Sequence, residues 1–167
     1  PYSDRSSFDR LARKIPVEFD CILPVLGAAN LKQALQTVAG AAARALDRNE
    51  KLLLENLMRR ERRAPSAVGG GVAIPHARMN GLDRPFLAFA RFEGGVNFNA
   101  VDNVPVDLVC LVLSPENTGN TDHLRRLARV SRLFRDRGLC HRLRGAEEES
   151  AVRALMLETA EEAAQAA

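Results

Sequence analysis

The residues best suited to reversible chemistry near neutral pH are the three histidines, and His76 has the most distinctive setting. It lies in the stretch GGGVAIPHAR at residues 69–78. The glycines permit positive φ and the close approach of a ligand, and Pro75 favours extended backbone before it. We therefore expect a short strand that runs up to His76 and ends there. Beside the glycines and Arg78, this imidazole is well placed to meet a phosphate, although an ordinary surface histidine after a glycine turn would give the same pattern.

His123 follows a polar loop at 116–122, which itself follows a long apolar segment. Ligands gather at loops that end sheet strands in α/β folds, so His76 and His123 could converge. His141 lies in the arginine-rich segment CHRLRG and is expected to be an exposed helix residue.

Three kinds of chemistry could use these histidines. A zinc site needs three or four ligands at supportive spacing, and no HxH, HxxxH or CxxC occurs, so we expect no metal. Catalysis by serine lacks a Gly-x-Ser-x-Gly motif, and only Ser66 lies near the histidine. The remaining use is the imidazole itself as a nucleophile toward phosphorus, with arginine and backbone N–H donors around the phosphoryl group.

The composition excludes several classes of protein. A length of 167 residues suits one domain, and a net charge of +3 is too mild to predict nucleic-acid binding. The sequence contains no apolar run of about 18 residues, the length that a membrane-spanning helix needs. The cysteines are three, widely spaced, and no secretion signal is present, which predicts reduced thiols in the cytoplasm. The glycines lack the lysine and spacing of a P-loop, so we expect no cofactor and a phosphoryl donor that is another molecule, plausibly a protein.

The pattern predicts helices around a central sheet in one domain. Residues 1–16 are expected to form a poorly ordered lead-in, 17–160 the domain and 161–167 a frayed tail. The segment at 17–26 reads as extended or as a loose turn. The sequence predicts helices from Asn30 to Asp47, from Asn49 to before Pro65, from about 121, and from 147 to 161, with a short helical turn through Leu139 and Leu143 that stops at Gly145. The inward face of the helix from 121 is expected at Leu124, Leu127, Ala128, Ser131, Leu133 and Phe134. Strands are expected at 86–92, before a turn at 94–95, and at 104–113.

Several segments resemble one known family. GGGVAIPHAR, preceded by LMRRER at 57–62, is similar to the enzyme IIA domains of the bacterial phosphotransferase system, in the fructose and mannitol class. The stretches FNAVDNVPVDLVCLVLSP, DHLRRLARVSRLFRD and CHRLRGAEEESAVRALM look most like the nitrogen-related branch. The resemblance covers roughly residues 31–157.

The resemblance implies an α/β (α+β) fold with a mixed sheet of about five strands, flanked by helices on both faces. It also implies roles for individual residues. His76 would accept a phosphoryl group from the histidine-phosphocarrier protein, while His123 and Arg60 would contact the phosphoryl oxygens. As further phosphate-binding candidates we take Gly69, Gly70, Gly71, Arg78 and Ser66.

The family pattern leaves open what the phosphorylated domain does next. In the nitrogen-related branch the phosphorylation state decides which regulatory target proteins are bound; the alternative is a sugar-specific enzyme IIA that passes phosphate to a permease subunit. A third reading is a basic interaction domain without phosphoryl transfer. Gly70, Ala77, Arg78 and the loop before His123, which is one residue longer, depart from the common family pattern and bear on partner preference. A homodimer is also left open.

Overall fold

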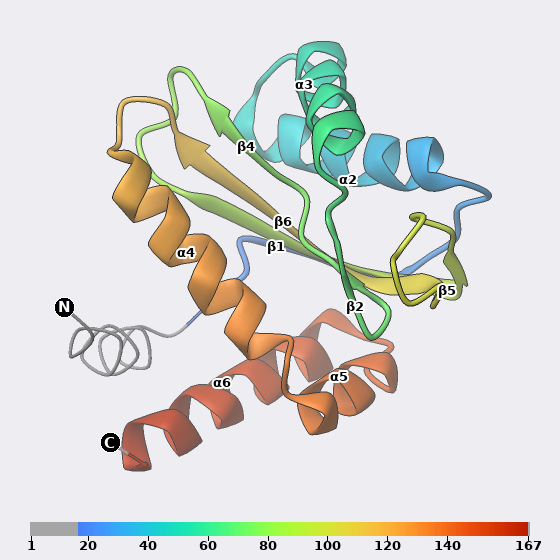
Figure 1. The fold of residues 1–167 in the computed structure, drawn as a ribbon. Helices are drawn as coiled ribbons and strands as arrows, with labels where there is room; N and C mark the ends of the chain where they lie inside the picture. The colour runs from blue at the N-terminus through green and yellow to red at the C-terminus, as the bar shows by residue number, and fades with distance from the viewer. Residues whose placement is uncertain (1–16, 167) are drawn as a thin grey trace, which may run out of the picture.

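Strand β6 (Val106–Pro115) is the centre of the fold. Its nearly uninterrupted apolar sequence predicts a strand covered on both faces, and every residue from Leu108 to Ser114 is fully buried. The computed structural model describes residues 17–166, so the predicted lead-in at 1–16 lies outside the described part. Figure 1 shows the sheet between two layers of helices.

The sheet has six strands and is mixed, one more than the expected number of about five. The order is β1-β5-β6-β3-β2, and β4 also pairs with β6. Antiparallel pairs join β5 to β6 and β2 to β3, and the other pairs are parallel. The strands besides β6 are β1 (Cys21–Leu26), β2 (Ala67–Gly69), β3 (Val72–Ala73), β4 (His76–Met79) and β5 (Phe86–Val96).

The structure decides three local expectations. Residues 21–26 form the edge strand β1, which pairs with β5, so the extended alternative for this segment is confirmed and the loose turn is wrong. The predicted turn at Gly94 and Gly95 is instead a register shift inside β5, where both glycines have positive φ. The strand predicted to run up to His76 is β3, which ends at Ala73, and His76 begins the separate strand β4.

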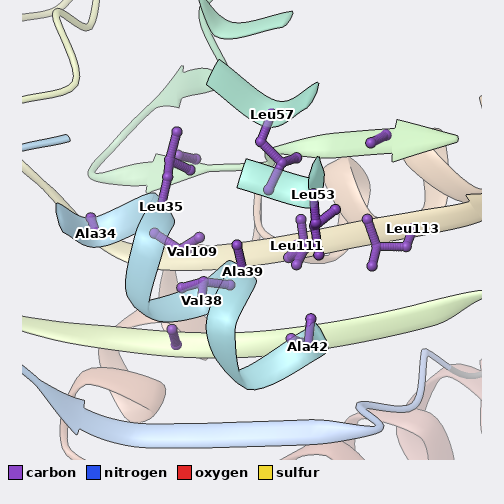
Figure 2. Packing of buried hydrophobic residues seen from close by; sticks show 14 of the residues in the cluster. Ala34, Leu35, Val38, Ala39, Ala42, Leu53, Leu57, Val109, Leu111 and Leu113 are labelled. Atoms are coloured by element: carbon purple, nitrogen blue, oxygen red, sulfur yellow. The ribbon is translucent and has the colours of Figure 1, made fainter. Parts of the chain in front are cut away.

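One face of the sheet is covered by α2 (Leu31–Leu46) and α3 (Glu50–Arg63). Both begin as predicted, because the Asn30 side chain accepts a hydrogen bond from Gln33 N and the Asn49 side chain accepts one from Leu52 N. Figure 2 shows how their apolar faces pack on alternate residues of β6. The labelled residues are Ala34, Leu35, Val38, Ala39, Ala42, Leu53, Leu57, Val109, Leu111 and Leu113.

The opposite face is covered by α4 (Asn120–Leu133), α5 (Arg137–Arg144) and α6 (Glu149–Gln165). These helices pack on the intervening residues of β6, Leu108, Cys110 and Val112. The expectation of helices on both faces is therefore confirmed. Helix α6 runs beyond the expected end at 161, so residues 161–165 are helical.

The predicted inward face of α4 is wrong at Leu124 and Ala128, whereas Leu127, Leu133 and Phe134 pack on the core as expected. Leu124 is 62% exposed and Ala128 is exposed, whereas His123 and Val130 are buried. The true inner stripe is His123, Leu127 and Val130, which follows helical spacing. A histidine occupies the place where an apolar residue was expected. None of the helices in the described part is both long and apolar enough to cross a membrane.

Candidate active site

His76 is placed by the strand it begins. Its backbone pairs with Val112 of β6, and the half-buried ring turns back so that Nδ1 lies 2.9 Å from the carbonyl oxygen of Ile74. A carbonyl can only accept, so Nδ1 carries the proton and Nε2 carries the lone pair. Burial lowers the pKa of His76; the Ile74 hydrogen bond opposes this, and the charge of Arg60 lowers the pKa further. The ring is therefore neutral near pH 7.

His123 lies directly beside His76, although the two are far apart in the sequence. Their ring centroids are 5.5 Å apart and the ring planes are inclined by 51°. His123 is 7% exposed and its Nδ1 lies 2.6 Å from the hydroxyl oxygen of Ser114. Burial, His76 and three arginines lower the pKa of His123 to about 4. Two neutral imidazoles thus meet at the end of β6.

Arg60 supplies positive charge to this pair. It lies in the last turn of α3 and is exposed, and its charge lowers the pKa of both His76 and His123. The structure therefore brings together the three residues named for the reaction: His76, His123 and Arg60. An exposed guanidinium beside two neutral rings can bind an incoming anion.

Arg78 is placed differently from the expectation. Its guanidinium donates to the side-chain oxygen of Asn120 and to the backbone carbonyls of Glu116 and Thr118. It therefore holds the loop between β6 and α4. A role in binding phosphate stays a prediction, and these contacts already occupy both terminal nitrogens of Arg78.

Ser66 lies between α3 and β2, and its backbone is hydrogen-bonded to the segment that precedes His76. Its carbonyl accepts a hydrogen bond from Ile74 N, and its own N–H donates to the carboxylate of Glu61. The residue is 6% exposed, and its hydroxyl has no hydrogen-bond partner among the described residues. Its predicted contact with phosphate remains open.

The glycine stretch is not brought to the histidines. Gly69, Gly70 and Gly71 form the turn between β2 and β3, all with positive φ. The Gly71 carbonyl accepts from Leu108 N, whereas the Pro75 carbonyl accepts from Val112 N. Between residues 108 and 112 a strand advances about 13 Å. The glycines therefore lie near the start of β6 and His76 near its end, a position that does not support the predicted phosphate-binding role.

The backbone of this turn also has other partners. Gly70 N donates to Asp102, and the Gly70 carbonyl accepts from Arg144. Positive φ is required here by a tight hairpin and a close approach to Arg144 and Asp107. The glycines are thus explained by the conformation of this turn and not by contact with a phosphate.

Two residues of the site were not found from the sequence. Ser114 is fully buried at the end of β6, and Arg126 donates to its hydroxyl from the next turn of α4 after His123. The available signals were a serine closing an apolar strand and an arginine three positions after a histidine, and neither is distinctive. No cluster of three or more metal-ligating side chains occurs within residues 17–166.

Residues 17–159 match the family model described as "Phosphoenolpyruvate-dependent sugar phosphotransferase system, EIIA 2". This chain belongs to that family. As an EIIA 2 protein it is a phosphotransferase-system component, and the resemblance drawn from the motif around His76 is confirmed at the level of the family.

Relatives of this EIIA 2 protein carry two kinds of name. A "Nitrogen regulatory protein" of Bradyrhizobium diazoefficiens is 43% identical over 133 residues, which cover 80% of this chain and 86% of the relative. A "PTS system fructose-specific EIIA component" of Haloferax volcanii is 35% identical over 127 residues, or 76% and 80% of the two chains. The crystal structure of nitrogen regulatory protein IIA-Ntr from Neisseria meningitidis superposes with a TM-score of 0.74 at 28% identity, covering 81% of this chain and 92% of that one.

Proposed function

We propose that this EIIA 2 protein accepts a phosphoryl group from a histidine-phosphocarrier protein onto Nε2 of His76. The observation that carries the proposal is the bond from His76 Nδ1 to the Ile74 carbonyl, 2.9 Å long, beside the ring of His123. It fixes the tautomer in which Nε2 holds the lone pair. The lowered pKa keeps that lone pair available at neutral pH without a general base.

The transfer is an in-line displacement at phosphorus. The Nε2–P bond to His76 forms as the P–N bond of the donor phosphohistidine breaks, and the bonding pair returns to the donor nitrogen. Nδ1 of His76 keeps its proton and its bond to Ile74 throughout. Arg60 supplies positive charge to the phosphoryl oxygens and the neutral ring of His123 donates a hydrogen bond to them, so catalysis consists mainly of positioning and electrostatic stabilisation.

We propose a regulatory output, in which the phosphorylation state decides which target proteins the domain binds, in the cytoplasm. The name of the 43% identical relative, "Nitrogen regulatory protein", supports this. The second candidate is a sugar-specific EIIA that passes the group to a permease subunit, favoured by the 35% identical fructose-specific relative. Incubating the phosphorylated domain with a fructose-type EIIB domain separates the two: rapid loss of the label to EIIB would favour transport.

The direct test is mass spectrometry of the protein after exposure to the phosphorylated carrier, with the modified histidine localised. Wild type should carry one phosphoryl group on His76, and His76→Ala should carry none. His141→Ala is the matched control, because His141 is exposed on α5, away from the site, and should leave the label unchanged. An acid-labile label of wild-type extent in His76→Ala would refute the proposal.

His123 and Arg60 are expected to affect the rate of transfer but not the site of the label. His123→Ala and Arg60→Ala should each slow transfer while leaving the acceptor nitrogen in place. A lost charge-assisted contact of about 2 kcal/mol corresponds to about a 30-fold lower rate. If neither variant changes the rate, the site built from these side chains is wrong. A wild-type protein that takes up no label from the phosphorylated carrier would instead favour a domain that binds partners without phosphoryl transfer.

A further inference from the structure

Ser114 is a buried hydroxyl at the centre of the site that the proposed mechanism does not yet use. It closes an otherwise apolar run of β6 and is fully buried. Its Oγ lies 2.6 Å from Nδ1 of His123 and 2.7 Å from Nη1 of Arg126. Both partners come from the first turns of α4, so Ser114 ties that helix to the end of β6.

The chemistry of the three groups fixes the direction of these bonds. A guanidinium can only donate, so Oγ of Ser114 accepts from Arg126. The hydroxyl then has one proton left to donate, and a buried hydroxyl is almost always satisfied. Nδ1 of His123, 2.6 Å away, is the acceptor that the structure places beside this oxygen. If Nδ1 donated instead, the hydroxyl proton would be buried without an acceptor, which costs about 1–3 kcal/mol.

The consequence is a defined tautomer of His123. With Nδ1 accepting from Ser114, the ring proton lies on Nε2. His76 has the reverse arrangement, because its Nδ1 donates to the Ile74 carbonyl. The two rings, 5.5 Å apart between centroids, thus offer a lone pair on one Nε2 and a proton on the other.

We propose that Ser114, oriented by Arg126, is a positioning residue that holds His123 in the Nε2–H tautomer so that His123 donates to the phosphoryl group carried by His76. This inference rests on the proposed function for the phosphoryl group, but the tautomers themselves do not depend on it. A donor fixed before the phosphoryl group arrives costs no reorganisation during transfer. The charges of Arg60, Arg78 and Arg126 around His123 also disfavour a doubly protonated ring.

The decisive measurement is nitrogen NMR of the histidine rings in the full chain labelled with ¹⁵N. Wild-type His123 should show a pyrrole-type Nε2 and a pyridine-type Nδ1, and His76 the opposite pattern. Ser114→Ala should convert His123 to a mixture of tautomers while His76 keeps its pattern. A wild-type His123 that carries its proton on Nδ1 would overturn the proposal, whatever the transfer rate.

Transfer kinetics give the second readout. Ser114→Ala should lower the rate of phosphoryl acceptance about tenfold, the equivalent of one hydrogen bond, with the label still on His76. Because Ser114 is buried, Arg126→Met serves as a second variant at a partly exposed site, and Arg126→Lys, which keeps a donor, should recover part of the rate and the tautomer. Arg129→Met, one turn along the same helix, is the control and should match wild type.

The outcomes separate this inference from the function beneath it. If wild type accepts no phosphoryl group on His76 but shows the expected tautomers, the proposed function fails and the arrangement of Ser114 stands. If wild type accepts the group while Ser114→Ala and Arg126→Met change neither the His123 tautomer nor the rate, the positioning role fails and the phosphoryl acceptor stands.

Discussion

Arg78 gives a direct test of how the site is held together. Its guanidinium donates to the carbonyls of Glu116 and Thr118 and to the side chain of Asn120. Glu116 and Thr118 lie in the loop that leads into α4, and Asn120 is the first residue of that helix, whose N-cap, Gly119, has no side-chain capping bond. A guanidinium can only donate, so Arg78 does not cap the free N–H groups of the helix. It instead holds the loop and the start of α4 to β4. Replacing it with methionine keeps the stem and removes all three bonds.

The expected loss of stability follows from these contacts. A hydrogen bond contributes about 1 kcal/mol net, and more when the donor is charged. Arg78 is only partly buried and the freed carbonyls can turn to water, so three bonds should amount to about 2 kcal/mol. With a urea slope of about 2 kcal/mol per M, Arg78→Met should shift the unfolding midpoint by about 1 M at constant slope.

A matched arginine and a conservative variant sharpen the result. Arg142→Met removes an exposed ion pair to Glu158 and should cost less than about 1 kcal/mol. Arg78→Lys should recover only part of the loss, because an ammonium cannot span the three acceptors as a planar fork. If Arg78→Met is as stable as wild type while phosphoryl acceptance falls, Arg78 contacts the phosphoryl group and the reasoning about the loop is refuted.

Two further predictions concern stability. The folded pKa of His123, about 4, lies below its ordinary value of 6.5, so the unfolded chain binds a proton at this residue first as the pH falls. The free energy of unfolding is therefore highest above about pH 6.5, and it decreases by up to about 3 kcal/mol as the pH falls toward 4. Urea unfolding at several pH values should show that the free energy of unfolding falls less with decreasing pH in His123→Gln than in wild type. The same dependence on pH in both proteins would contradict the burial argument. Gly71→Ala should destabilise by about 2 kcal/mol or more, because its Cβ would lie 2.8 Å from Arg144 and 3.0 Å from Asp107 at φ +79°. Gly70→Ala, at φ +65° with open space around it, should cost only about 1 kcal/mol, so equal losses would show that crowding at Gly71 is unimportant.

Local signals accounted for much of the architecture. The capping side chains of Asn30 and Asn49 act within their own helices, so the sequence alone predicts where α2 and α3 begin. The apolar run of β6 likewise predicts a strand buried on both faces, because burial on two sides leaves no polar alternation.

Long-range contacts decided the rest. The glycine turn suggested a phosphate cradle, but its conformation serves contacts with Asp102 and Arg144, which lie far along the chain. The start of the inner face of α4 was misplaced to Leu124 because counting apolar residues skips a histidine, although His123 is buried on that face. The bond between Ser114 and His123 depends on how α4 docks on the sheet, which periodicity does not report.

Both rings of the site are attached to the same strand. His76 is registered against Val112 by the β4–β6 ladder, and His123 is hydrogen-bonded to Ser114, the next residue on that face of β6. Neither attachment passes through the connecting loop at 116–119. That loop can therefore gain or lose a residue among homologues and acquire new surface chemistry while the distance between the imidazoles is preserved. The surface of the loop can thus change while the two imidazoles beneath it keep their places.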